Sequence, residues 1–308
     1  MTVTFEQVRS RLRLASLAAA FAFLAACTGT KVDSSKIHAV GAENFYAGVI
    51  EQIGGSHVEV HAVLTNPNTD PHSYESSTTD ASAVASADLI VENGLGYDAF
   101  MQKLEAASPR AGRTVINVGQ VFGKQPGDDP HLWYRPGTMQ RIAQLVASEL
   151  SKRDPANAKA YEANRATFVA SLAPWTDAIA TVKRRYHGTA VAVTEPVFNY
   201  TASALGLDIR TPASFQLAVE EGNDPAPQDV TAVTGLLASK STKALIYNQQ
   251  AVEPTTARLL DLARKNSVPV IGVYETQPPR MTYAQWMKAE VDAVQQALQS
   301  GKSTEKLP

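Results

Sequence analysis

The segment Asp154–Tyr186, DPANAKAYEANRATFVASLAPWTDAIATVKRRY, decides the fold, because a long helical pattern here separates two sets of strand-like runs. Its large apolar residues recur at intervals of three, four and seven: Tyr161, Phe168, Leu172, Trp175, Ile179, Val182 and Tyr186. This spacing predicts a long amphipathic helix packed along a neighbour. Pro174 would remove a backbone hydrogen bond, at about 3 kcal/mol, so we expect a kink or a break into two helices there.

Short apolar runs alternate with helical stretches on both sides of this segment. The expected strands are 37–41, 57–64, 88–92 and 114–118 before it, and 189–194, 207–210, 244–248 and 268–273 after it. Such alternation is typical of parallel sheets flanked by helices. We therefore predict an α/β fold with two lobes, 36–153 and 187–308, each containing a four-stranded, mainly parallel sheet. The linker helix, 154–186, joins them, and we expect no large hinge closure across so stiff a connection.

The N-terminal 26 residues have the pattern of a secretion signal, in which Arg9, Arg11 and Arg13 precede an apolar run. That run is about 13 residues long, whereas a membrane-spanning helix needs about 20. The run ends at Leu24-Ala-Ala-Cys27, which resembles a bacterial lipobox. We therefore predict signal cleavage before Cys27 and its acylation, although a signal peptide with an incidental cysteine is the alternative. Residues 27–35 are small and polar and are expected to form a flexible tether.

Composition limits the classes of function. About 270 residues follow the predicted tether, which is enough for two lobes with separate cores. The formal net charge of −2 provides no basic field for binding nucleic acid. A single cysteine excludes internal disulfides. The sequence thus indicates an exported protein, anchored by lipid and facing the periplasm or the cell exterior, and we expect a monomer.

One tripeptide occurs twice, as Asp70-Pro71-His72 and as Asp129-Pro130-His131. Proline restricts its own backbone and that of the preceding residue, so each histidine follows a stiffened loop. The aspartates, Asp70 and Asp129, are placed to orient an imidazole ring. A single copy would more simply be a turn with an exposed histidine, but two copies downstream of predicted strands favour a metal site.

Two glutamates follow predicted strands in the second half of the chain. Glu195 comes directly after strand 189–194, and Glu275 comes two residues after strand 268–273. Ligands of open parallel sheets collect beyond the carboxyl ends of the strands. His72, His131, Glu195 and Glu275 could therefore converge between the lobes on one divalent ion. The alternative for each glutamate is a charge in the first turn of a helix.

Several motifs together resemble the metal-binding solute-binding proteins of zinc and manganese ABC importers, also called cluster A-I binding proteins. The matching stretches are Gly41–Tyr46, Ile53–Gly55, Asp70–Glu75, Ala87–Asp98, Asp129–Trp133 and Thr194–Tyr200. The resemblance implies two α/β lobes joined by a long helix, with the metal in the cleft and delivery to an ABC permease and its ATPase. His72 and His131 match the first two ligand positions.

The other two ligand positions bear on the choice of metal. Glu195 stands where zinc-type members usually carry histidine, as in the manganese-type members. Glu275 takes the place of an aspartate that usually follows the last strand. Oxygen donors suit manganese, yet zinc accepts two histidines with two carboxylates, so both metals stay open and iron(II) is a lesser candidate.

Two other classes of function compete with metal capture. A metal-dependent hydrolase would use Glu195 or Glu275 as a general base, but the chain has no His-Glu-x-x-His or Gly-x-Ser-x-Gly motif. A surface adhesin lipoprotein is the third possibility, supported only by the predicted anchorage. We therefore expect a binding protein and not an enzyme.

Overall fold

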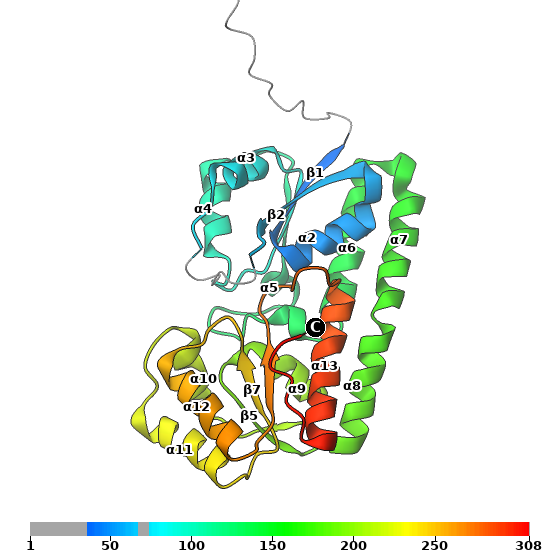
Figure 1. Ribbon diagram of the computed structural model, residues 1–308. Coiled ribbons are helices and arrows are strands. Elements are labelled where there is room, and N and C mark those ends of the chain that lie inside the picture. Colours follow the sequence, from blue (N-terminus) through cyan, green and yellow to red (C-terminus); the bar gives the residue numbers. More distant parts are fainter. Residues whose placement is uncertain (1–35, 67–73, 308) are drawn as a thin grey trace, which may run out of the picture. The chain divides into compact units, whose positions relative to one another are not determined.

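Two parallel sheets of four strands each form the framework of the molecule (Figure 1). The computed structural model describes residues 36–66 and 74–307. The first sheet has the order β2-β1-β3-β4 and the second β6-β5-β7-β8, with parallel neighbours throughout. The strands are β1 Ile37–Glu43, β2 Val58–Leu64, β3 Leu89–Glu92, β4 Thr114–Asn117, β5 Ala190–Val193, β6 Asp208–Ile209, β7 Leu245–Asn248 and β8 Val270–Val273. The predicted α/β class is confirmed, and each strand lies within its predicted run or overlaps it.

Helices connect the strands and cover the sheets. Before the linker they are α2 Asn44–Gly54, α3 Thr78–Ser86, α4 Ala99–Ala107, α5 Val118–Val121 and α6 Thr138–Arg153. After it they are α9 Asn199–Ala204, α10 Ala213–Glu220, α11 Pro227–Ala238, α12 Pro254–Lys265 and α13 Tyr283–Ser300. Short 3₁₀ turns occupy Gly55–His57, Leu132–Tyr134, Pro155–Asn157 and Pro196–Phe198.

The linker segment consists of two consecutive helices, α7 Ala158–Ser171 and α8 Ala173–Tyr186, which meet at Leu172. Pro174 lies in the first turn of α8, where backbone N–H groups form no hydrogen bond within the helix. The absence of an N–H in proline therefore costs nothing at this position. The proline therefore marks the start of a second helix. Helix α7 packs against α2 and α6, whereas α8 packs along α13 (Figure 1). Together the two helices run beside both halves of the chain.

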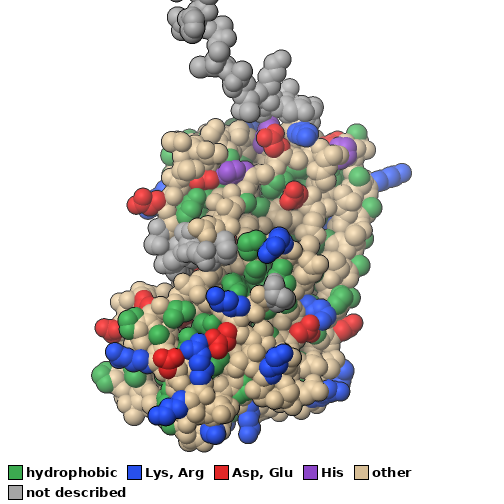
Figure 2. All heavy atoms as spheres, in the orientation of Figure 1, with side chains coloured by type: hydrophobic (Ala, Val, Ile, Leu, Met, Phe, Trp, Pro, Cys, Tyr) green, Lys and Arg blue, Asp and Glu red, His purple; other side chains and the backbone are tan. Residues whose placement is uncertain are grey.

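One hydrophobic core crosses from the first half of the chain, before α7, to the second half, after α8. It includes Phe45 and Trp133 from the first half together with Val191, Phe198 and Trp286 from the second. Two smaller cores lie beneath individual sheets, one in each half. The residues from Ile37 onward accordingly form one compact unit. On the face displayed in Figure 2, acidic and basic side chains are interspersed, in keeping with the formal net charge of −2.

The predicted signal peptide, 1–26, and the predicted tether with Cys27 lie outside the described residues. In the part of the chain that is described, no helix is long and apolar enough to cross a membrane.

Candidate metal centre

The carboxyl ends of three neighbouring strands in the second sheet bring polar side chains together. Glu195 follows β5, Asn248 is the last residue of β7, and Glu275 follows β8. Each of the three residues is at least 95% buried. The amide nitrogen of Asn248, Nδ2, donates to Glu195 Oε2 at 2.7 Å and to Glu275 Oε1 at 2.9 Å. One amide thus holds two buried carboxylates side by side.

The loop that carries His131 is fixed by contacts from both halves of the chain. Asn93 Nδ2 donates to the carbonyl of Pro130 at 2.9 Å, and the Tyr200 hydroxyl donates to the carbonyl of Asp129 at 3.1 Å. The backbone N–H of His131 donates to Asp129 Oδ1 at 3.0 Å. Because Tyr200 belongs to the second half, this loop joins the halves as well as presenting a histidine.

The ring of fully buried His131 has two nitrogens in different surroundings. Nδ1 lies 2.7 Å from Asp129 Oδ1. Nε2 lies 3.8 Å from Glu275 Oε1 and 3.8 Å from Glu220 Oε1, and has no hydrogen-bond partner among the described residues. The ring of Trp133 packs edge-on against the imidazole at 5.1 Å between centroids. A carboxylate on Nδ1 with a free Nε2 is the arrangement in which histidine binds metal ions.

Glu220, which the sequence reasoning missed, is the fourth member of this group. Its side chain is 9% exposed, and Glu220 Oε2 has no hydrogen-bond partner within the described part of the chain. The same is true of Glu195 Oε1. We call His131, Glu195, Glu220 and Glu275 the donor cluster. Asn248 was also missed, although a polar residue that ends a buried strand is a signal that could have indicated it.

The electrostatics of the donor cluster reflect three carboxylates around one imidazole. Burial raises the pKa of Glu195 well above its ordinary value, and the charge of Glu275 adds to this effect. Burial likewise raises the pKa of Glu220 to about 7, against the opposing influence of His131. Burial lowers the pKa of His131, but its contacts with Asp129 and Glu275 outweigh this, and its pKa lies well above the usual value. Without a metal the cluster therefore holds protons, which a divalent cation would displace.

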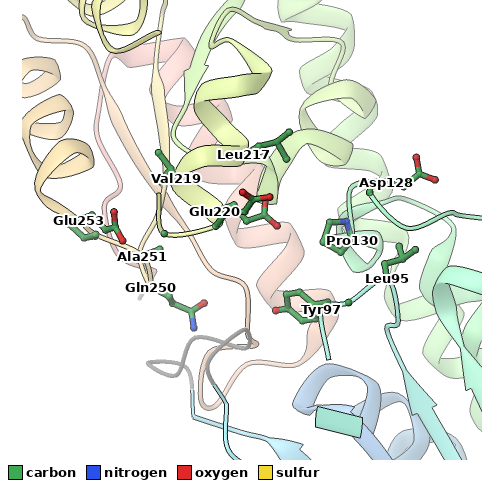
Figure 3. A pocket seen from close by; sticks show the side chains of 15 residues that line it. Leu95, Tyr97, Asp128, Pro130, Leu217, Val219, Glu220, Gln250, Ala251 and Glu253 are labelled. Carbon is green, nitrogen blue, oxygen red and sulfur yellow. The ribbon is translucent and has the colours of Figure 1, made fainter. Parts of the chain in front are cut away.

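A cavity of about 680 Å³ opens beside the donor cluster (Figure 3). Figure 3 shows Leu95, Tyr97 and Pro130 on one side of it and residues of the second half on the other, with Glu220 between them. Glu220 also lines a second, smaller cavity of about 180 Å³. Glu220 is thus the member of the donor cluster that lines these two cavities.

The structure brings together three of the four residues proposed as ligands from the sequence: His131, Glu195 and Glu275. His72, together with its neighbour Asp70, lies outside the described residues. Across residues 36–66 and 74–307, no three His, Cys, Asp or Glu side chains are arranged closely enough to hold an ion. A tetrahedral ion with bonds of about 2.1 Å would draw its donors to about 3.4 Å from one another, slightly closer than the 3.8 Å seen here.

The fold and the donor cluster define a class of protein: two α/β halves braced by helices, with an imidazole and three carboxylates buried between them. Comparison with known families identifies the family to which the chain belongs. The chain belongs to the family described as zinc-uptake complex component A, periplasmic, whose model matches residues 40–297. The family resemblance inferred from the sequence motifs is thereby confirmed.

Individual relatives agree with this assignment. The chain is 31% identical over 176 residues to the metal ABC transporter substrate-binding lipoprotein ScbA of Streptococcus cristatus, covering 52% of this chain and 56% of that protein. It is 26% identical over 190 residues to the manganese-binding lipoprotein MntA of Halalkalibacterium halodurans, covering 59% of this chain and 62% of MntA. The matches thus span little more than half of either relative.

A solved structure matches over most of the described fold. It is a manganese-bound mutant of a periplasmic metal binding protein from Candidatus Liberibacter asiaticus, with a TM-score of 0.67 and 18% identity. The match covers 85% of this chain and all of that one. At this identity the likeness concerns the fold alone.

Proposed function

We propose that this protein is an extracytoplasmic solute-binding protein that captures one divalent transition-metal ion between its lobes, 36–153 and 187–308, and passes it to an ABC importer. The observation that carries the proposal is the set of buried, unpartnered donor atoms, His131 Nε2 and Glu195 Oε1, which lie beside Glu275 in the described part of the chain. A buried polar atom without a partner costs about 1–3 kcal/mol, so such a set is kept for a ligand.

His131, Glu195 and Glu275 act as ligands in this proposal, and His72 completes the shell from the other Asp-Pro-His loop. Asp129 orients the ring of His131, and Asp70 does the same for His72. The two imidazoles and two carboxylates accept manganese or zinc. The relative MntA is a manganese-binding lipoprotein, which supports manganese, and the family description supports zinc.

The remaining parts of the proposal concern the setting of the protein. Acylation of Cys27 anchors the chain to a membrane, and residues 27–35 form a tether to the lobes. The permease of an ABC importer, together with its ATPase, is the partner to which the metal is delivered. The chain works as a monomer without catalysis. The names of ScbA and MntA, both lipoproteins, support this setting.

Metal titration tests the proposal. The full chain, purified in detergent and stripped with a chelator, is titrated with Mn(II) and Zn(II) and then analysed for metal content. We expect one equivalent of metal per chain. His131→Ala should lower the affinity well over tenfold, because it removes a ligand, whereas the exposed Lys240→Ala should not change it. Failure of the wild-type chain to retain either metal would refute the proposal.

A further inference from the structure

Glu220 lies as close to His131 as the proposed ligand Glu275 does. The distance from His131 Nε2 is 3.8 Å to Glu220 Oε1 and 3.8 Å to Glu275 Oε1. Donors on one tetrahedral ion with bonds of about 2.1 Å lie about 3.4 Å apart, so both carboxylates need the same small approach to His131 to share an ion with it. Glu220 is therefore placed as well as Glu275 for binding such an ion.

The position of Glu220 in the fold gives the carboxylate no local benefit. It is the last residue of α10, where the negative end of the helix dipole disfavours an acidic side chain. Its side chain is 9% exposed, and Oε2 has no hydrogen-bond partner among the described residues. The imidazole of His131 lies near Oε1 but leaves Oε2 without a partner, and a polar atom buried in this way lowers stability. Its placement is explained if a cation is the missing partner.

Glu220 is also the outermost member of the donor cluster. It lines both cavities beside the cluster, whereas the side chain of His131 is 0% exposed. The other acidic residues that line the larger cavity are Asp128, Glu221 and Glu253, and its described lining contains no Lys or Arg. This wall attracts cations. Glu220 projects into this cavity (Figure 3), whereas His131 is not part of the cavity lining.

We propose that Glu220 is an additional metal ligand, which binds the ion at the mouth of the site and favours Mn(II) over Zn(II). This inference rests on the proposed function. A third carboxylate adds an oxygen donor to His131, Glu195 and Glu275. Manganese suits oxygen-rich, six-coordinate shells, whereas zinc is satisfied by four ligands in a tetrahedron. Losing Glu220 should therefore weaken manganese binding more than zinc binding.

The test compares Glu220→Gln with Glu51→Gln, a matched change at an exposed glutamate on α2 that lines neither cavity. Affinities for Mn(II) and Zn(II) are measured on the full chain by competition with a chromogenic chelator. We expect Glu220→Gln to weaken Mn(II) binding at least tenfold and Zn(II) binding less than threefold. Glu51→Gln should change neither affinity.

A second measurement separates a ligand from a residue that only shapes the cleft. Water-proton relaxation by bound Mn(II) counts the waters on the ion, and Glu220→Gln should increase that number as water replaces the carboxylate. An unchanged water number, an unchanged Mn(II) affinity, or equal losses for both metals would overturn the proposal.

Two controls keep the result interpretable. If Glu220→Gln does not fold, Glu220→Asp replaces it, because this variant keeps the charge but shortens the side chain. It should show the same selective loss of Mn(II) affinity. Unchanged Mn(II) affinity in that variant would count against the proposal. If the wild-type chain binds neither metal, the proposed function itself fails. If the wild-type chain binds metal and the variant matches it, only the role of Glu220 fails.

Discussion

The loop at 129–134 supplies two adjacent regions that are built in opposite ways. The first region is an aromatic seam between the halves, formed by Trp133, Tyr134, Tyr283 and Trp286. There the Tyr134 hydroxyl donates to the carbonyl of Tyr274 at 2.6 Å, and the Tyr283 hydroxyl donates to the carbonyl of Trp133 at 2.5 Å.

The donor cluster begins one residue before Leu132, at His131, and leaves His131 Nε2, Glu195 Oε1 and Glu220 Oε2 unpartnered within the described residues. The seam holds the halves together through packing and satisfied hydroxyls. The cluster instead leaves buried donor atoms without hydrogen-bond partners, which lowers stability. Truncating a side chain of the seam should therefore lower the free energy of unfolding. Neutralising a carboxylate of the cluster should raise the free energy of unfolding and weaken metal binding.

The largest effect is expected in the seam. Trp286 is fully buried, and its ring lies 6.0 Å from that of Phe45 and 5.8 Å from that of Tyr134. Trp286→Ala should lower the free energy of unfolding by about 3–5 kcal/mol, because it leaves a cavity where the halves meet. Urea denaturation measures this loss. Trp286→Phe keeps a ring in place, and a loss as large as that of the alanine variant would contradict the explanation by packing.

Asp129 connects the two regions and should affect binding more than stability. Asp129→Asn replaces the carboxylate that contacts His131 Nδ1 at 2.7 Å. Such changes typically weaken metal binding 10- to 100-fold, about 1.4–2.7 kcal/mol, because the ring is no longer held in one orientation. The measurement is metal titration of the purified variant, with Asp177→Asn, a change at an exposed aspartate of α8, as the control. Equal affinities in Asp129→Asn and the wild type would remove Asp129 from the site.

A change within the donor cluster should stabilise the metal-free chain. Burial and the charge of Glu275 raise the pKa of Glu195 in the folded chain. Above the ordinary pKa of a glutamate the unfolded chain therefore ionises more readily than the folded chain, and stability falls as the pH rises. Glu195→Gln removes that ionisation and should raise the unfolding free energy at pH 8 by about 1–2 kcal/mol. The same variant should bind metal more weakly. A metal-free variant less stable than the wild type would show that Glu195 supports the fold.

The smallest effect concerns a buried acid behind the seam. Burial raises the pKa of Glu290 to about 8, although Trp286 Nε1 donates to its Oε1 at 2.7 Å. The folded chain thus holds a proton that the unfolded chain releases, and this contribution to stability falls as the pH rises toward 8. From pH 6 to pH 7, wild type should lose about 1 kcal/mol more than Glu290→Gln, as read from denaturation at both pH values. Parallel pH profiles would contradict this.

Much of the fold could be predicted because local patterns carry it. The runs at 37–41 and 268–273 are apolar and bounded by helical stretches, and both contain strands of parallel sheets. Pro174 marked the junction of α7 and α8 to within two residues, because proline acts on its own backbone. These features depend on neighbours in the sequence.

The candidate site was only partly predictable, because its remaining members depend on distant contacts. Glu220 is followed by Glu221 and Gly222, a sequence typical of an exposed turn. It is buried because α10 meets the His131 loop, which lies far away in the sequence. Asn248 likewise gains its role only when β5, β7 and β8 align side by side.

The contact between Phe45 and Trp286 also has a consequence for the order of folding. These rings come from α2 and α13, near opposite ends of the described chain, yet they share one core. The first half of the chain therefore cannot bury all its apolar surface until α13 has been synthesised. Contacts so distant in sequence slow folding, because the closure entropy of a long loop must be overcome first. A nascent chain that stops before Tyr283 should remain exposed to proteases and chaperones.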